Sequence, residues 1–334
     1  MERRLLLLFA RTGRGHEQAA LALRGELLDR HADIRVELLD IGELNPLLRP
    51  LPQVYSMLMR YFPRLYSLLF KSTNGRRRAD FIGRIVARLI RRHLFEVTED
   101  VPTQMVVLHP FFLSTALREL RHRYEMTWII QVVTLDLANP HAGWWCSGVD
   151  EIYVFCEEAR SRASELAPSP VPLLVCGFPV GKVPFWAQKP RDSDEKWLVL
   201  CAGIVPMSRF LRLLVMAIND STRRGLRLCV ITSGSRAQAW VARRFGGHIE
   251  AYTSLDNTDF MGLLQRADRI IAKAGPSLLA EVVQLDVHVD ILNEVGDQEQ
   301  GNALIYNSGR LIASSDRPEL VAELLAETPV ARAN

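Results

Sequence analysis

The feature that most constrains the fold is an alternation of short apolar runs with helical patterns, which occurs twice along the chain. The first run, residues 5–10, leads through a glycine turn at residues 12–16 into a helical pattern over residues 17–30, and a second apolar run follows at residues 34–39. A continuous apolar run of this length is typical of a parallel strand buried on both faces. Strand, turn, helix and strand form a βαβ unit, so the sequence predicts an α/β protein.

The alternation continues and then starts again after a break. Residues 168–190 hold six of the 17 prolines, and residues 191–196 are almost all charged. Further runs that are typical of strands lie at residues 105–108, 128–133 and 152–155 before the break, and at residues 197–201, 226–231, 249–252, 269–272 and 287–292 after it. We therefore predict two Rossmann-like domains, residues 1–180 and 196–330, which are joined by a linker over residues 181–195 and face a central cleft.

The strongest local motif follows the predicted strand at residues 269–272. Gly275 and Pro276 make a turn that begins a helix, whose free N–H groups and dipole favour a phosphate near Ser277. Glu281 lies one turn further along the same helix face, where its carboxylate is placed to accept two ribose hydroxyls. A Gly-Pro turn that merely ends a strand, with a solvated Glu281, has the same spacing.

A polar run at residues 297–302 follows the next predicted strand. Its side chains include Gln298, Glu299 and Asn302, at a strand end where open α/β sheets bind hydroxyl-rich ligands. A polar surface loop that leads into a capped helix would look the same.

The turn at Gly13, Gly15 and His16 occupies the equivalent edge of the first predicted domain. A histidine at a helix N-terminus is held neutral and is therefore able to accept a proton, although a cap or a packed side chain is the commoner role. Asp136 and His141 follow the predicted strand at residues 128–133, so they are expected at the same edge. We predict that Asp136 orients His16, while an aspartate that caps a turn is an equal alternative.

Residues 55–92 interrupt the alternation with long helical patterns that break near Pro63 and at residues 74–75. The segment carries ten Lys or Arg residues and one acid, whereas the whole chain has a net charge of only +3. Arginines beside apolar side chains are typical of an interfacial helix on an anionic bilayer. The residues expected at that surface are Arg76, Arg77, Arg78, Phe70 and Phe81. Ordinary amphipathic helices with a solvated face remain an alternative, and a nucleic-acid surface would leave the apolar bulk unexplained.

The remaining composition restricts the setting. Five cysteines without a Cys-x-x-Cys pair argue against a disulfide scaffold or a zinc ribbon, and no His/Cys cluster has metal-ligand spacing. The run at residues 5–10 is too short for a signal peptide, and no run reaches the length of a membrane span. We therefore expect a peripheral protein on the cytoplasmic face of a membrane.

Taken in order, these motifs resemble the monogalactosyldiacylglycerol synthases and processive diacylglycerol glucosyltransferases of glycosyltransferase family 28. The resemblance is carried by residues 12–16, by Asp136 with His141 and Trp144, and by residues 177–180, 270–281 and 297–302. Five features depart from the family pattern. Ala10 and Arg11 stand where many relatives have an acidic residue, Leu135 is an extra residue before Asp136, and residues 201–206 are a degraded glycine-rich loop that keeps Gly203. Ser277 and Asp297 each replace a glycine.

The resemblance implies a GT-B fold, with a UDP-hexose bound by the second domain and diacylglycerol by the first. It implies an inverting transfer in which His16, supported by Asp136, is the base, with no metal or cofactor required. Gly13, Gly15 and His141 would lie near the acceptor. The donor would be held by Gly203, Lys273, Gly275, Pro276, Ser277, Leu278, Glu281, Gln298, Glu299 and Asn302.

The sequence leaves several choices open. Galactose is favoured over glucose, but neither the number of transfers nor the oligomeric state follows from the residues. An undecaprenyl-linked cell-wall precursor is an alternative acceptor, and a non-catalytic membrane-binding relative is an alternative to an enzyme. Anionic membrane lipids are expected partners, and nucleic acid is not.

Overall fold

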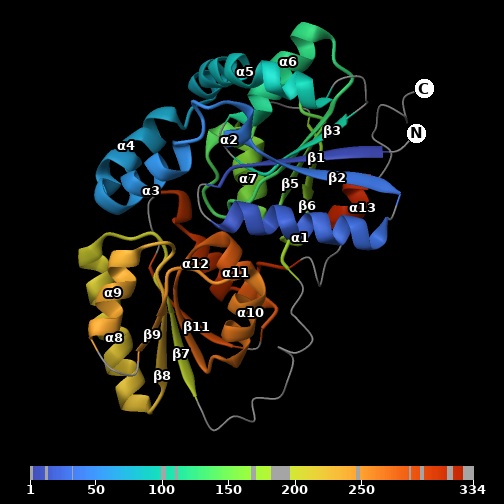
Figure 1. Ribbon diagram of the computed structural model, residues 1–334. Coiled ribbons are helices and arrows are strands. Elements are labelled where there is room, and N and C mark those ends of the chain that lie inside the picture. The colour runs from blue at the N-terminus through green and yellow to red at the C-terminus, as the bar shows by residue number, and fades with distance from the viewer. Residues whose placement is uncertain are drawn as a thin grey trace.

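The computed structural model describes residues 3–11, 14–31, 33–98, 103–109, 112–166, 171–181, 196–245, 249–285, 287–293, 297–313 and 319–325. It contains two parallel β-sheets, which Figure 1 shows one above the other. The predicted α/β class with two Rossmann-like units is confirmed. Of the predicted linker, residues 182–195 lie outside the described residues.

The first sheet has the strand order β2-β1-β3-β4-β5-β6. Its strands are β1 (Arg3–Phe9), β2 (Ile34–Asp40), β3 (Thr103–Val107), β4 (Ile129–Val133), β5 (Glu151–Val154) and β6 (Leu173–Val175). Helices α1 (Arg14–Arg30), α6 (Leu113–Tyr124) and α7 (Glu157–Leu166) pack on it. Leu5, Leu6, Leu7 and Leu8 are all 0% exposed. Covering by helices on both faces therefore explains the uninterrupted apolar run.

The second sheet has the order β11-β10-β7-β8-β9. It is built from β7 (Trp197–Cys201), β8 (Arg227–Ile231), β9 (Ile249–Tyr252), β10 (Arg269–Lys273) and β11 (His288–Asn293). Its helices are α8 (Met207–Arg224), α9 (Arg236–Arg244), α10 (Asn257–Arg266) and α11 (Pro276–Val283). In each sheet the first strand lies inside, with later strands added on both sides, so each sheet has a topological switch point.

The helical insertion between β2 and β3 consists of α2 (Ile41–Leu44), α3 (Leu51–Tyr61), α4 (Pro63–Thr73) and α5 (Arg76–Thr98). The predicted breaks near Pro63 and at residues 74–75 are confirmed. Figure 1 shows α3 and α4 to the left of the first sheet and above α9 of the second domain. Met59 of α3 is buried in the same core as Leu198 and Phe210 of the second domain. The hairpin α3–α4 is therefore an interdomain element as well as a surface one.

The end of the chain returns to the first domain, contrary to the predicted division at residues 196–330. After η3 (Asp297–Glu299) and α12 (Asn302–Asn307), the chain reaches α13 (Glu319–Leu325), which lies beside α1 in Figure 1. Leu320, Val321 and Leu324 are buried in the first core, and Arg3 donates to the carbonyl oxygen of Leu324 at 3.0 Å.

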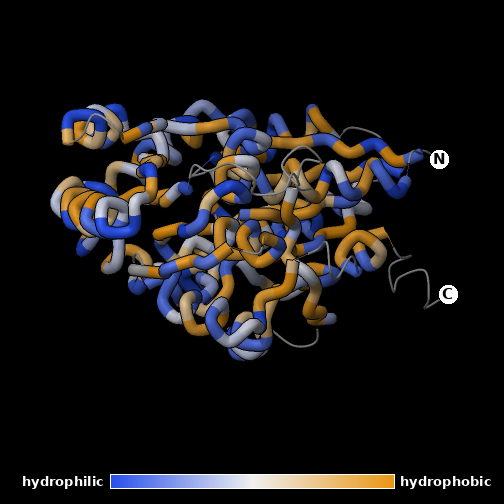
Figure 2. The backbone as a smooth tube through the Cα atoms, turned by 90° about the horizontal axis from the view of Figure 1, so that it is seen from below, coloured by the Kyte–Doolittle hydropathy of each residue, from blue (hydrophilic) through white to orange (hydrophobic). Residues whose placement is uncertain are grey.

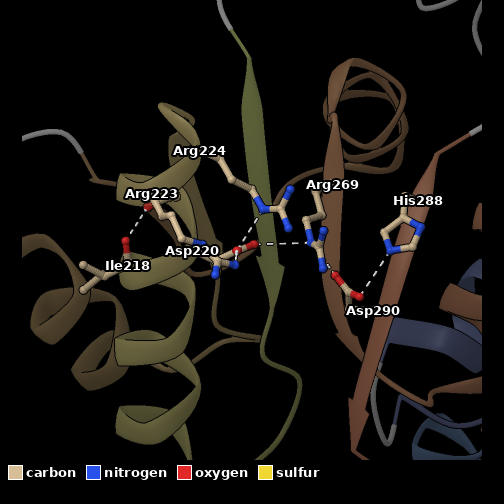
Figure 3. Close-up of polar contacts among 8 residues, drawn as sticks. Ile218, Asp220, Arg223, Arg224, Arg269, His288 and Asp290 are labelled. Atoms are coloured by element: carbon tan, nitrogen blue, oxygen red, sulfur yellow. Dashed lines mark hydrogen bonds and ion pairs between the residues drawn. The ribbon is translucent and has the colours of Figure 1, made fainter.

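A charge network ties α8 to the amino ends of β10 and β11, away from the strand ends that face the cleft (Figure 3). Asp220 accepts from Arg224 at 2.9 Å, and Arg269 lies 3.3 Å from Asp220 and 2.5 Å from Asp290. Hydrogen bonding by Arg224 lowers the pKa of Asp220. Arg224 is exposed, whereas Asp220, Arg269 and Asp290 are half-buried at the surface of the domain, so the network fixes local geometry more than it adds global stability.

The helix pair α5 and α6 offers a direct test of the packing. A Cβ added at Gly83 would lie 2.4 Å from the Cβ of Thr115, whereas one added at Gly25 of α1 meets nothing within 4 Å. Gly83→Ala should therefore lower the free energy of unfolding by about 1–3 kcal/mol. Gly25→Ala should raise it by about 0.5–1 kcal/mol, because it removes only the helix penalty of glycine. Urea titrations of the two variants would measure both, and equal effects would contradict this packing.

Apolar residues are concentrated in the inner strands and alternate with polar ones along the outer helices, as Figure 2 shows. No helix in the described ranges is long and apolar enough to cross a membrane. All five cysteines are free and buried.

Candidate active site

The carboxyl ends of the central strands of both sheets face one cavity. This cavity has a volume of about 760 Å³ and is lined by residues that follow β1, β7, β8 and β10. Parallel sheets bind ligands at such switch points, and the volume is that of a pocket for a whole small molecule. Most of the predicted site residues line it, namely Gly15, His16, Asp136, Gly203, Lys273, Gly275, Pro276, Ser277, Leu278, Glu281, Gln298 and Glu299.

Helix α11 forms one wall of the cavity. Gly275 is its N-cap with no side-chain cap, and Pro276 occupies the first turn. The first N–H groups of the helix are therefore available to an anion at the cavity wall, where the helix dipole also favours negative charge. Glu281 is only 7% exposed and lines the cavity, so the alternative of a solvated glutamate is wrong.

Lys273 ends β10 beside this helix and forms an ion pair with Glu299 of η3. Its side chain lies over Gly203, where φ is +68° and an added Cβ would lie 2.5 Å from the Lys273 Cδ. A glycine is required here both for the backbone conformation and for the close approach of the lysine. Gly203, which remains from the glycine-rich loop, thus allows the ammonium group of Lys273 to lie at the cavity wall.

The N-terminus of α1 faces that of α11 across the domain boundary. A Cβ added at Gly15 would lie 2.5 Å from the Ser277 Oγ and 3.3 Å from its Cβ. Gly15 therefore allows the two helix ends to approach, and His16 lines the same cavity as the start of α11. Gly13, which was predicted near the acceptor, lies outside the described residues.

His16 is held by the main chain. Its Nδ1 lies 2.9 Å from the carbonyl oxygen of Leu108, the residue that follows β3. Because a carbonyl oxygen only accepts, Nδ1 carries the proton and Nε2 carries the lone pair. Desolvation by the surrounding protein lowers the pKa of His16 to about 4. The imidazole is therefore neutral at pH 7, as its position at the start of a helix predicted.

Asp136 does not orient His16, contrary to the sequence prediction. Its Oδ2 accepts from Trp144 Nε1 at 2.7 Å, and its Oδ1 accepts from Gln298 Nε2 at 2.6 Å. Within the described residues no hydrogen bond joins Asp136 to His16, whose partner is the Leu108 carbonyl. Desolvation raises the pKa of Asp136 to about 6. The carboxylate links the first domain to the η3 loop of the second.

Asn302 forms hydrogen bonds within the protein and does not line the cavity, so its predicted contact with the donor is wrong. The side chain is 0% exposed. Its Oδ1 accepts from the Ala138 N–H, and its Nδ2 donates to the carbonyl of Ala274, each at 2.9 Å. The amide therefore joins the two domains directly behind the cavity.

His141 lies in a smaller adjoining cavity and has both ring nitrogens engaged. Its Nδ1 accepts from the Gly143 N–H at 2.9 Å, and its Nε2 lies 3.0 Å from Thr73 Oγ1. Phe70 packs edge-on against the His141 ring, with centroids 4.9 Å apart, and is 7% exposed. The prediction that Phe70 faces a membrane is therefore wrong, whereas Phe81 is 64% exposed.

Sequence reasoning missed two groups of cavity residues. Tyr55 and Tyr66 come from the helical insertion: Tyr55 lines the cavity, while Tyr66 lines the smaller adjoining one and donates its hydroxyl to Gln298 Oε1 at 2.9 Å. Ser233 and Gly234 follow β8, with φ of 47° and 85°. The second group has a sequence signal, because Ser-Gly-Ser after a predicted strand marks a turn at the same sheet edge. The tyrosines have none, since their position depends on how α3 and α4 pack.

The buried imidazole predicts a pH dependence of stability. The pKa of His16 is about 4 when folded and near its ordinary 6.5 when unfolded, so the stability it contributes is present above pH 6.5 and is lost as the pH falls towards 4. The pKa of Asp136 is raised, so its contribution to stability changes with pH in the opposite direction to that of His16. Any variant that retains Asp136 keeps this contribution. Between about pH 7 and pH 5, the free energy of unfolding should therefore fall by about 1–2 kcal/mol less in His16→Ala than in the wild-type protein. Urea titrations at both pH values would measure this, and an unchanged difference would contradict a neutral, desolvated His16.

The comparisons with known proteins agree with this arrangement. Two solved structures share the fold along nearly the whole chain. A glycotransferase of kitacinnamycin has a TM-score of 0.55 at 14% identity and covers 99% of this chain and 93% of its own. A putative UDP-N-acetylglucosamine 2-epimerase from Listeria monocytogenes has a TM-score of 0.55 at 13% identity, covering 98% and 89%. Two facing Rossmann-like domains with a shared cavity define this chain as a protein of the GT-B fold.

A family model for monogalactosyldiacylglycerol synthases matches residues 16–180. The chloroplastic enzyme of Spinacia oleracea is 25% identical over 90% of this chain and 61% of its own length. A probable synthase of Nicotiana tabacum is 23% identical over 97% and 64%. The chain thus spans somewhat less than two thirds of these relatives. It is related to the monogalactosyldiacylglycerol synthases, which confirms the family resemblance of its motifs.

Proposed function

We propose that this protein is an inverting glycosyltransferase. It transfers a hexose, galactose in preference to glucose, from a UDP-sugar to the free hydroxyl of diacylglycerol. The observation that carries the proposal is the cavity of about 760 Å³, which is lined by a neutral histidine of the first domain and by an uncapped helix N-terminus and a lysine of the second. The family relationship supports a glycosyltransferase that acts on a lipid acceptor.

The second domain would hold the donor. The N-terminus of α11 and Lys273 would contact the diphosphate, and both would stabilise the negative charge that develops on the departing UDP. Glu281, one helical turn further, would accept the ribose hydroxyls. Gln298 and Glu299 are placed for the sugar, after exchanging their present protein partners for hydroxyl groups. This source of positive charge belongs to the protein, so we expect transfer without an added metal.

The first domain would supply the base. Nε2 of His16 carries a lone pair and would take the proton of the attacking hydroxyl, while the Leu108 carbonyl keeps the ring in that tautomer. The base and the N-terminus of α11 line the same cavity and come from different domains. This arrangement suits in-line attack with inversion at the anomeric carbon.

The exposed side of the helical insertion would bind the membrane. Arg76, Arg77 and Arg78 are exposed in the first turn of α5, where cations oppose the helix dipole and therefore do not serve helix stability. The neighbouring α3 and α4 expose large apolar side chains, including Tyr61, Phe62, Leu65 and Leu68. Exposed basic and apolar groups on consecutive helices of this insertion fit an anionic bilayer, which we propose is on the cytoplasmic side.

Incubation with radiolabelled UDP-galactose or UDP-glucose tests the reaction. We expect label in a monoglycosyl diacylglycerol, more from UDP-galactose, and the same yield in the presence of a chelator. If the label appeared instead in a glycosylated undecaprenyl-linked lipid, that lipid class would be the acceptor and not diacylglycerol. Absence of UDP release with either lipid would leave the non-catalytic alternative.

Docking has a separate test. Replacing Arg76, Arg77 and Arg78 by glutamine should reduce flotation with phosphatidylglycerol vesicles. Three basic residues contribute about 1 kcal/mol each at low salt, and the loss should shrink as salt is added. As a matched control, three arginines of the second domain, Arg223, Arg224 and Arg244, should tolerate the same change. Unchanged flotation of the α5 variant would refute this docking surface.

A further inference from the structure

A second, smaller cavity adjoins the first. It has a volume of about 240 Å³ and shares His16, Tyr55 and Gln298 with the larger one. Helices α3 and α4 form its sides, and the region after β3 closes it. Its apolar lining is made by Leu51, Val54, Leu58, Leu69, Phe70 and Phe112.

Several polar groups in this cavity already have protein partners. The imidazole of His141 is engaged by Gly143 and Thr73, and the Tyr66 hydroxyl donates to Gln298. None of the described residues that line the cavity is Lys, Arg, Asp or Glu. Such walls favour a hydrocarbon over a charged headgroup, because a charge here would lose its hydration without gaining a counter-ion.

The cavity connects the catalytic wall with the apolar surface. Val54 and Leu69, from facing helices, line it and are still 41% and 43% exposed. The exposed apolar residues of α3 and α4 continue outward from them. At the other end lies His16. The lining thus passes from an apolar outer surface to the proposed base.

We infer that this cavity takes a hydrocarbon chain of the acceptor. The chain lies between α3 and α4, and the hydroxyl passes Tyr55 and Gln298 to reach His16. The volume is below that of pockets that enclose a whole ligand, so the cavity receives one part of an amphiphile while the rest stays at the surface. The inference rests on the proposed lipid acceptor and adds where its chain binds.

The test is photo-crosslinking without donor, so it does not depend on transfer. A diacylglycerol with a diazirine in one acyl chain is presented in phosphatidylcholine vesicles, and labelled peptides are mapped by mass spectrometry. We expect label on α3, on α4 and near Phe112. Leu69→Trp should fill the opening and lower this labelling about tenfold, the equivalent of excluding about two methylene groups.

Leu68→Trp is the matched control. Leu68 neighbours Leu69 on α4 and is 63% exposed, but it does not line the cavity. The change keeps a large apolar group on the surface, so labelling should stay within about twofold, since surface substitutions are nearly neutral. Equal labelling of both variants, or label confined to other segments, would overturn the inference. Wild-type labelling on α3 and α4 without any glycosyl transfer would instead refute the proposed function and retain the cavity as a lipid site.

Discussion

Replacing His16 by alanine should lower the turnover number by about two to four orders of magnitude, the usual contribution of a general base. The affinity for UDP should stay nearly unchanged, because the proposed donor contacts come from α11 and Lys273 in the other domain. Initial rates with UDP-galactose and diacylglycerol, together with calorimetric titration of UDP, would separate the two quantities. An alcohol has almost no alkoxide at neutral pH, so the loss should appear in turnover.

His31 provides the control for this prediction. It is exposed and follows the opposite end of the same helix. His31→Ala should therefore leave the rate unchanged. Near-normal turnover of the His16 variant would remove it from the role of base. A matching fall in UDP affinity would mean that the variant disturbs the contact between Gly15 and Ser277 instead.

Lys273→Met should weaken UDP binding by about 10- to 100-fold, since a hydrogen bond to a charged group contributes about 1.5–3 kcal/mol. The same change should lower the free energy of unfolding by about 3 kcal/mol, because the carboxylate of Glu299, which is 6% exposed, loses its ammonium partner. Calorimetry and urea titration would measure the two effects independently.

A double variant separates the ion pair from the ligand contact. Lys273→Met with Glu299→Gln removes both charges, so stability should largely return while UDP affinity stays low. If UDP affinity returned as well, Lys273 would act only by neutralising Glu299. If stability did not return, the ion pair would not be the cause of the loss.

Much of this architecture could be predicted from local patterns. The strands of both sheets lie within two residues of the predicted runs, apart from β6, which is short and falls in the proline-rich stretch. The breaks between α3, α4 and α5 follow from Pro63 and from Asn74 with Gly75. His16 and Gly275 could be placed at the cleft because a residue that follows a central parallel strand must lie at its carboxyl edge.

The sequence predictions that were wrong concern the partners that side chains contact and not the positions of those residues in the fold. Asp136 was expected to bind His16 but accepts from Gln298, which lies 162 residues away in sequence. Asn302 has a donor and an acceptor suited to a sugar, but the neighbouring backbone of Ala138 and Ala274 uses both. Phe70 has the composition of a membrane contact, but the rotation of α4 turns it towards His141.

The sequence by itself determined the strands, the turns and which residue types stand at the edge of each sheet. Burial periodicity and backbone preference act over neighbouring residues, so the chain carries these features locally. Only the tertiary structure decided that the two helix ends meet at Gly15 and Ser277, that α13 enters the first core, and that α3 and α4 enclose a second cavity. Those outcomes depend on how rigid elements pack across the domain boundary, where a polar group bonds to whichever partner the packing brings within reach.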